Sequence, residues 1–257
     1  MVKAWGAKGL HLWTKEENVL FFTKDQASYT LGSTANACLA SDAVITKLDG
    51  ALATSATSVT VDSTTGMTVG DFIGVVLTDE TVHYTTIATI PTSTTLTLTL
   101  GVVSAASDNA LVYTYTTKMS KPLRILGARR AQGIDEGTTT SLTEIELSEI
   151  AYQDYMNLPS KTISGIPNQY CYNPGDTTGI LYLWQRPSSG IYRLNFTSER
   201  VIQDLDNVGD NFDLPNEWLE ALTWQLSLRL CPAFGKDQRM INSIAPMAQA
   251  MLQDLLD

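Results

Sequence analysis

The chain has 257 residues, 44% of them hydrophobic, and a formal net charge of −10. This hydrophobic content argues against a wholly disordered chain, and the acidic balance argues against tight general DNA binding, which depends on neutralising phosphates. No apolar run approaches the roughly 20 residues of a membrane-spanning helix, so we expect no membrane contact. The cysteines, Cys38, Cys171 and Cys231, are too scattered for a Cys-x-x-Cys pair, which predicts a reducing compartment without a zinc ribbon.

The first 32 residues predict a helix end followed by extended chain. Residues 1–9 resemble the last turn of a helix, with Trp5 in a short apolar patch before two glycines. Residues 18–22 form a compact apolar run that predicts a strand. Residues 24–32 predict a turn that leads into a second short extended segment.

The composition changes between about Val44 and Thr117, where threonine becomes common and Lys and Arg nearly vanish. β-Branched and aromatic residues alternate there with polar ones, in short segments separated by Gly, Asp, Ser and Pro. Segments of this kind at roughly ten-residue spacing predict a small all-β barrel or sandwich, inserted into the chain and peripheral to its core. The predicted strands span 58–62, 72–77, 82–87, 95–100 and 111–115.

Further strands follow the threonine-rich segment. Residues 121–131 predict an extended segment, and the alternation over 142–147 predicts another strand. Ser148 is placed to cap a short helix over 149–157, with Tyr152 and Met156 on one face. The segments 169–172, 179–184 and 191–196, separated by Pro- and Gly-containing turns, predict an antiparallel meander.

The C-terminal region predicts two helices. Asp213 is placed to cap the first, Pro215 fits its first turn, and Pro232 and Gly235 mark its end. Its main apolar stripe is predicted to pack in the core, and a second apolar face suggests burial on more than one side. The last helix contains Pro246, which is expected to kink or split it. The stripe consists of Trp218, Leu219, Leu222, Leu226 and Leu230, and the second face of Trp224 and Leu228.

Segregated strands and helices predict an α+β fold: a C-terminal helical pair with antiparallel strands and the inserted β-module. The expected domains are a core formed by residues 1–43 and 118–257, and the module, residues 44–117.

No residue pattern predicts a catalytic, cofactor or metal site. The two histidines, His11 and His83, lie outside any His-Glu-x-x-His pattern, and we expect His83 to be structural. Residues 204–210 resemble the start of a calcium loop, but Val208 stands at its fifth position, so a solvated loop is favoured. Glu144 and Glu146 share a strand face, a weak sign of a glycosidase pair that we interpret as solvent exposure.

The candidate interface residues are basic or aromatic. A basic cluster over 118–130 in an acidic chain suits docking onto an acidic partner or contact with DNA phosphates, and the alternative is a solvated strand face. At period two, Arg124 is expected to share a face with Arg130 but not with Arg129. Tryptophan is enriched at subunit interfaces, and Trp5 and Trp13 are favoured as anchors. The candidates are Trp5, Trp13, Lys121, Arg124, Arg129, Arg130, Trp218 and Trp224, with Lys118 also in the basic cluster.

Several segments, in order along nearly the whole chain, resemble the head-to-tail adaptor (connector) proteins of tailed bacteriophages, mainly short-tailed ones. Their combination is more specific than any single segment. They are Ala-Trp-Gly-Ala-Lys-Gly-Leu-His-Leu-Trp at 4–13, Gln-Ala-Ser-Tyr-Thr-Leu-Gly at 26–32, Lys-Pro-Leu-Arg-Ile-Leu-Gly-Ala-Arg-Arg at 121–130, Asp-Tyr-Met-Asn-Leu-Pro-Ser-Lys at 154–161, Gly-Ile-Leu-Tyr-Leu-Trp at 179–184, Leu-Pro-Asn-Glu-Trp-Leu-Glu-Ala-Leu at 214–222 and Leu-Arg-Leu-Cys-Pro-Ala-Phe-Gly at 228–235.

The resemblance implies a non-enzymatic virion protein without cofactors. It implies a homo-oligomeric ring of about twelve copies that docks on the portal protein and joins a downstream tail or nozzle protein. Genomic DNA would pass through its channel without specific binding, and assembly would take place in the host cytoplasm. Family members usually have further helical residues before the Ala-Trp segment, so the N-terminus is short here or absent from the given sequence. One alternative is a tail adhesin that binds receptors through residues 44–117, and another is a polysaccharide hydrolase.

Overall fold

The computed structural model describes residues 15–36, 38–40, 43–132, 143–175, 178–200 and 217–254. The chain divides into two compact units, one of them Lys15–Arg200, and the described part of the other is 217–254. Several predictions lie outside the described residues: the helix end at 1–9, Trp5, His11, Trp13, the loop at 204–210, and the roles of Asp213 and Pro215. The mixed α+β fold class is confirmed, because antiparallel strands dominate the first unit and a pair of helices forms the second.

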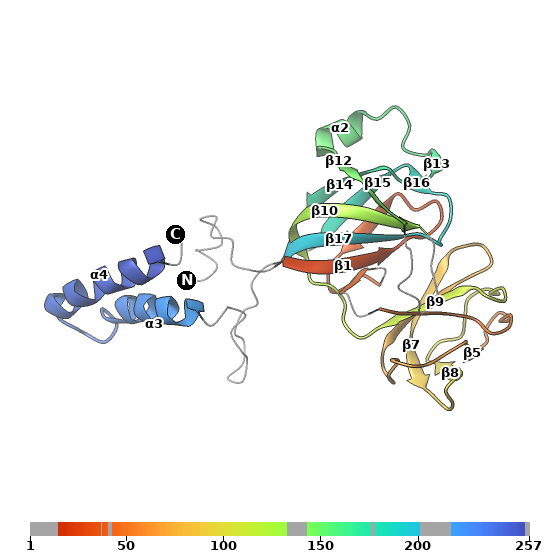
Figure 1. The fold of residues 1–257 in the computed structure, drawn as a ribbon, viewed down its shortest axis with the longest axis horizontal. Coiled ribbons are helices and arrows are strands. Elements are labelled where there is room, and N and C mark those ends of the chain that lie inside the picture. Colours follow the sequence, from red (N-terminus) through yellow and green to blue (C-terminus); the bar gives the residue numbers. More distant parts are fainter. Residues whose placement is uncertain are drawn as a thin grey trace. The chain divides into compact units, whose positions relative to one another are not determined.

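Two sheets form the part of the first unit that we call the body (Figure 1). A small parallel pair and the helix α2 (Tyr152–Asn157) accompany them. The five-stranded sheet has the order β11 (Thr143–Glu146), β10 (Pro122–Gln132), β17 (Arg193–Arg200), β1 (Lys15–Phe21) and β3 (Cys38–Ala40). The four-stranded sheet has the order β12 (Ser148–Glu149), β14 (Gln169–Pro174), β15 (Gly179–Trp184) and β2 (Ser28–Leu31), and the small pair is β13 (Ser164–Gly165) with β16 (Arg186–Pro187).

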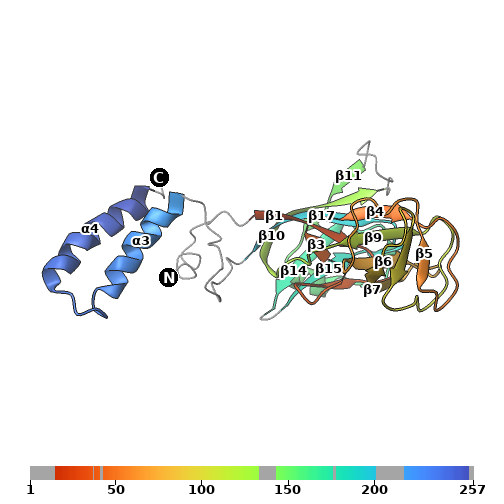
Figure 2. The ribbon, with the colours of Figure 1, turned by 90° about the horizontal axis from the view of Figure 1, so that it is seen from below.

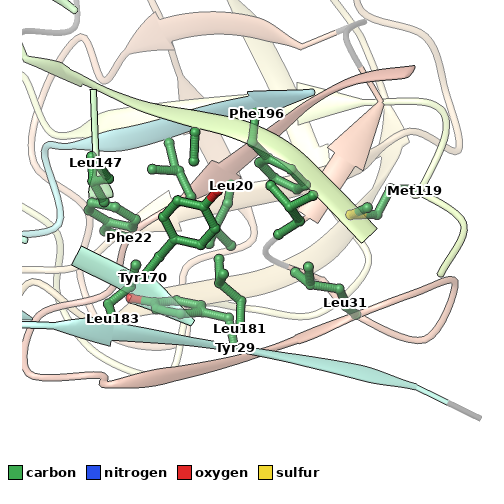
Figure 3. Close-up of a cluster of buried hydrophobic side chains, with 14 residues drawn as sticks. Leu20, Phe22, Tyr29, Leu31, Met119, Leu147, Tyr170, Leu181, Leu183 and Phe196 are labelled. Atoms are coloured by element: carbon green, nitrogen blue, oxygen red, sulfur yellow. The ribbon is translucent and has the colours of Figure 1, made fainter. Parts of the chain in front are cut away.

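The core of the body combines residues from the inner faces of both sheets (Figure 3). In β17, Leu194 and Phe196 are fully buried while the residues between them are half-buried, as period-two alternation requires. Tyr29 and Leu181 contribute from the four-stranded sheet. β1 pairs with β17 along all of its residues, so two segments far apart in the sequence form the centre of the five-stranded sheet.

Residues 44–117, the β-module, contain a separate six-stranded sheet (Figure 2). This sheet has its own hydrophobic core. Hydrogen bonds from Asp49 N to Thr60 O and from Asp62 N to Lys47 O join the two ends of this curled sheet. Strands are confirmed in all five predicted segments, while the domain division itself stays a prediction. The order is β4 (Val44–Lys47), β9 (Leu111–Tyr115), β6 (Phe72–Val76), β7 (Val82–Thr89), β8 (Thr95–Leu98) and β5 (Ser58–Thr60).

A third hydrophobic cluster lies where the β-module meets the body. The ring of Phe21, from β1, stacks on that of Tyr113, from β9, with the centroids 3.7 Å apart and the planes at 10°. Both side chains are fully buried, and the Tyr113 hydroxyl donates a hydrogen bond of 2.8 Å to that of Tyr84. The module is therefore packed on the body through a shared aromatic contact as well as through its two chain connections.

The second unit is a hairpin of α3 (Glu217–Leu230) and α4 (Gln238–Asp254). The prediction that α3 ends near Pro232 and Gly235 is confirmed: Gly235 has a φ of 61°, and its N–H donates to the carbonyl of Pro232. Helix α4 runs through Pro246 without a break, so of the two predicted effects of this proline the split is wrong, and a kink stays a prediction. The Gln225 amide contributes to the pairing by donating a 2.9 Å hydrogen bond to the carbonyl of Ala248.

Two local predictions are wrong. The hairpin of β14 and β15 exists, but β15 pairs next with β2, and β17 belongs to the other sheet, so there is no three-stranded meander. Ser148 does not cap a helix, because it lies in β12 and pairs with Gln169. Helix α2 starts later, after Ala151, and Tyr155 is its buried residue, whereas Tyr152 and Met156 are exposed. In both cases pairing with a distant strand overrides the local pattern.

A buried tyrosine in β14 makes the stability of the protein sensitive to alkaline pH. Burial, reinforced by Glu149 and Glu146, raises the pKa of Tyr170 from 10.0 to about 12. The folded protein therefore holds the neutral phenol, and this stabilisation is complete below pH 10 and is lost as the pH rises to about 12. We expect the free energy of unfolding to fall by about 2–3 kcal/mol from this group across that window. Urea unfolding at a series of pH values should show a shallower fall for Tyr170→Phe, and identical profiles would contradict this expectation.

Candidate assembly surfaces

The basic cluster lies largely on β10, where acidic side chains of neighbouring strands balance it. Arg124 forms a bidentate pair with Glu199 of β17, with its Nε 2.7 Å from Oε2 and its Nη2 2.9 Å from Oε1, and this contact raises the pKa of the guanidinium. Arg129 lies between Glu17 and Glu144, 3.5 Å from a carboxylate oxygen of each. These exposed pairs make the outer face of the sheet a charge-balanced network rather than a basic patch.

The facing of these arginines differs from the prediction. The register of β10 against β17 shifts twice, between Pro122 and Arg124 and between Ile125 and Gly127. An extra residue in one strand reverses the alternation beyond it. Arg124 therefore shares the exposed face with Arg129, while Arg130 is buried.

The two lysines of the cluster contact groups of the same chain. Lys118 Nζ donates a 2.6 Å hydrogen bond to Asn36 Oδ1 and lies 4.4 Å from the centroid of the Phe72 ring, and desolvation lowers its pKa. Lys121 Nζ donates to the carbonyl of Gly175. Both lysines therefore tie body segments to each other or to the β-module, and an intermolecular role for Lys121 stays a prediction.

A shallow pocket of about 470 Å³ opens beside the irregular part of β10, on the same outer face. Glu144 and Glu146 line it together with Arg129 and Lys15. The Glu144 carboxylate also accepts a 2.6 Å hydrogen bond from Asn195 Nδ2. These contacts make Glu144 part of the charge-paired network on this face.

Arg130 is only 5% exposed, and its Nε and Nη1 atoms have no hydrogen-bond partner. Its guanidinium carbon lies 5.4 Å from the centroid of the Tyr192 ring, a cation–π contact that offsets part of the desolvation cost. We expect Arg130→Met to raise the free energy of unfolding by about 1–3 kcal/mol, because the apolar side chain fills the site without unpaired donors. Chemical denaturation measures the free energy of unfolding, and Arg129→Met, at an exposed position, is the matched control. Destabilisation by Arg130→Met would contradict this expectation and show that the buried charge is compensated.

The helical hairpin leaves large apolar side chains uncovered. Within α3, Trp218 and Leu222 are buried, but Leu226 and Leu230 are 47% and 41% exposed, and Phe234 in the following turn is 71% exposed. The C-terminal half of the predicted stripe is therefore uncovered in the single chain. The half-buried Trp224 and Leu228 lie on the predicted second face, and Met240 and Met247 of α4 are also exposed.

Sequence reasoning placed the interface candidates on tryptophans and arginines and missed this surface. The sequence does contain a sign of this surface, because the apolar stripe of α3 is longer than the part of it that is buried in the single chain. Of the predicted tryptophans, Trp218 is buried, and any intermolecular role of the candidates remains a prediction.

Among the described residues, no group of three or more His, Cys, Asp and Glu side chains is arranged to hold a metal ion, and no helix has the length and apolarity to cross a membrane. His83 is buried in β7, with its Nε2 3.3 Å from the carbonyl oxygen of Leu100, which fits the structural role predicted for it. Cys171 and Cys231 are buried and free.

Comparison with known proteins adds one decisive observation. The sequence model of the SU10 adaptor protein family matches residues 42–257, which is most of the chain. The chain belongs to the SU10 adaptor protein family. The match covers the β-module, most of the body and the helical hairpin. It confirms the resemblance noted from the sequence and indicates a bacteriophage adaptor protein. No curated protein matches the sequence.

Proposed function

We propose that this SU10 adaptor family member is a head-to-tail adaptor that assembles into a ring on the portal protein. The ring extends the DNA channel and joins the capsid to the tail. The observation that carries this proposal is the apolar surface of the helical hairpin, formed by Leu226, Leu230 and Phe234 with Met240 and Met247. Exposed apolar side chains gathered on one element are typical of a protein–protein contact, so this surface is suited to a partner.

Neighbouring copies of the same chain suit this surface. Obligate interfaces between subunits are large and more apolar than transient ones. A head-to-tail contact between identical subunits closes into a ring when its rotation closes, and the family resemblance suggests about twelve copies. In this arrangement residues 1–43 and 118–257 form the adaptor core, and residues 44–117 form the inserted module.

The charge of the chain is compatible with DNA transport. A net charge of −10 would repel genomic DNA from the channel wall, so that DNA slides through without specific binding. Portal docking and attachment of a downstream tail or nozzle protein would use other surfaces of the ring, with Trp5 and Trp13 as the remaining aromatic candidates. The protein would assemble in the host cytoplasm and reside at the capsid–tail junction of the virion.

Electron microscopy of the full chain mixed with its cognate portal tests this function. We expect class averages of the portal to gain a ring of additional density at one end, with a fixed ratio of the two proteins after co-purification. Portal particles that remain unchanged at saturating concentrations of the folded chain would overturn the proposal.

A further inference from the structure

The turn between β6 and β7 contacts two segments of the body far from both chain connections of the β-module. The backbone N–H of Lys24 donates to the carbonyl of Glu80 at 3.4 Å, and Lys24 Nζ lies 3.9 Å from Glu80 Oε1. On the other side, the N–H of Gly190 donates to Glu80 Oε2 at 3.3 Å. One residue of the module therefore contacts both the turn after β1 and the turn before β17.

Glu80 adopts a backbone conformation that costs free energy. Its φ is 64°, in the left-handed region that favours glycine. The turn is closed by hydrogen bonds from Leu77 N to Thr81 O and from Glu80 N to Leu77 O, both 2.8 Å long. A glycine at position 80 would relieve the strain but would provide no carboxylate. A strained residue whose side chain reaches a distant segment points to a positioning role.

The body provides space for this turn at Gly190. A Cβ atom at this position would lie 3.1 Å from the Glu80 carbonyl oxygen and 3.4 Å from that of Phe22, closer than most Cβ contacts. The absence of a side chain at Gly190 therefore allows the turn to approach the body. Val76, at the end of β6, is 3.8 Å from the same point and belongs to the hydrophobic cluster between module and body.

A second attachment lies at the opposite end of β9 from this turn, beside the module's entry, where Val44 pairs with Thr114. The Tyr115 hydroxyl donates a 2.5 Å hydrogen bond to the carbonyl of Asn36, and Lys118 donates to the Asn36 side chain. One attachment allows a domain to pivot, whereas two separate attachments fix its orientation.

We propose that the β6–β7 turn is a latch that fixes the orientation of the β-module on the body, with Glu80 and Gly190 as its positioning residues. The module is thereby a rigid extension of the adaptor subunit rather than a tethered head, which goes beyond the function proposed above and does not depend on it.

Hydrogen exchange of the full chain, followed by mass spectrometry, tests the latch. We expect Glu80→Gly to accelerate exchange about 2- to 10-fold in peptides containing the N–H groups of Lys24 and Gly190, since the hydrogen bonds holding them weaken. Glu80→Gln keeps an acceptor for Gly190 and should restore most of the protection. Gly190→Ala, which acts from the body side, should accelerate exchange in the same peptides.

Ser55→Gly is the matched control, because Ser55 also has a left-handed φ, of 67°, but lies in an exposed turn of the module. It should leave exchange in the two body peptides unchanged. The β14–β15 hairpin reports global stability and should exchange equally in all variants. Unchanged or slower exchange of the two body peptides in Glu80→Gly would mean that relief of strain is the whole effect, and would overturn the latch.

Discussion

Replacing Tyr113 with alanine is expected to lower the free energy of unfolding by about 3–5 kcal/mol, the usual cost of removing a large buried aromatic ring. The ring is fully buried, stacks on Phe21 of the body, and fits against Gly74, where a Cβ atom would lie 2.5 Å from its Cζ. Because the ring is shared, body and module should lose stability together.

The matched control is Tyr113→Phe, which keeps the ring and removes only the hydrogen bond to Tyr84. It should cost about 1 kcal/mol. Urea denaturation followed by exchange in both the body and the module measures these changes. If Tyr113→Ala lowered the stability of the β-module alone and left that of the body unchanged, the contact between Tyr113 and Phe21 would not couple the stability of the two parts.

Introducing charge into the exposed stripe of α3 is expected to abolish self-association. We predict that Leu226→Glu combined with Leu230→Glu weakens subunit association at least roughly 30-fold, since loss of an interface hot spot costs about 2 kcal/mol or more. Both side chains are exposed in the single chain, so the helix itself should remain folded. Sedimentation velocity over a concentration series measures the association, and circular dichroism measures the helix.

Gln249→Glu combined with Gln253→Glu is the control for this experiment, because it introduces the same two charges at exposed polar positions of α4. It should leave association within a few-fold of the unaltered protein. Equal association of all three proteins would show that the stripe is not a subunit interface, and the ring would then need another surface.

The local periodicity of the sequence predicted the helices and strands of this protein better than it predicted which strands pair with one another. In the β-module, strands such as β8 alternate buried leucines with half-buried threonines, and the interior they share lies within the same segment, so sequence alone located the strands. The helical pair was predicted because Pro232 and Gly235 mark the end of α3. The predicted meander failed because the choice of partner for β17 depends on β1, which lies some 175 residues away in the chain.

The candidate site was less predictable, for two physical reasons. The bulged register of β10 depends on its pairing with β17 and reverses the facing of Arg130, which no alternation rule in the sequence reveals. The exposure of Leu226 depends on how far α4 covers α3, which is set by tertiary packing and not by the local sequence. In both cases the residue type indicated a candidate, but its burial depends on a neighbour that the sequence does not identify.

Native mass spectrometry of the purified full chain, alone and with its cognate portal, tests the central claim most directly. The account predicts a complex in which a fixed number of adaptor chains joins each portal ring, with or without a ring of the adaptor alone. Single chains in both samples, at concentrations where the portal is intact and the chain is folded, would contradict it.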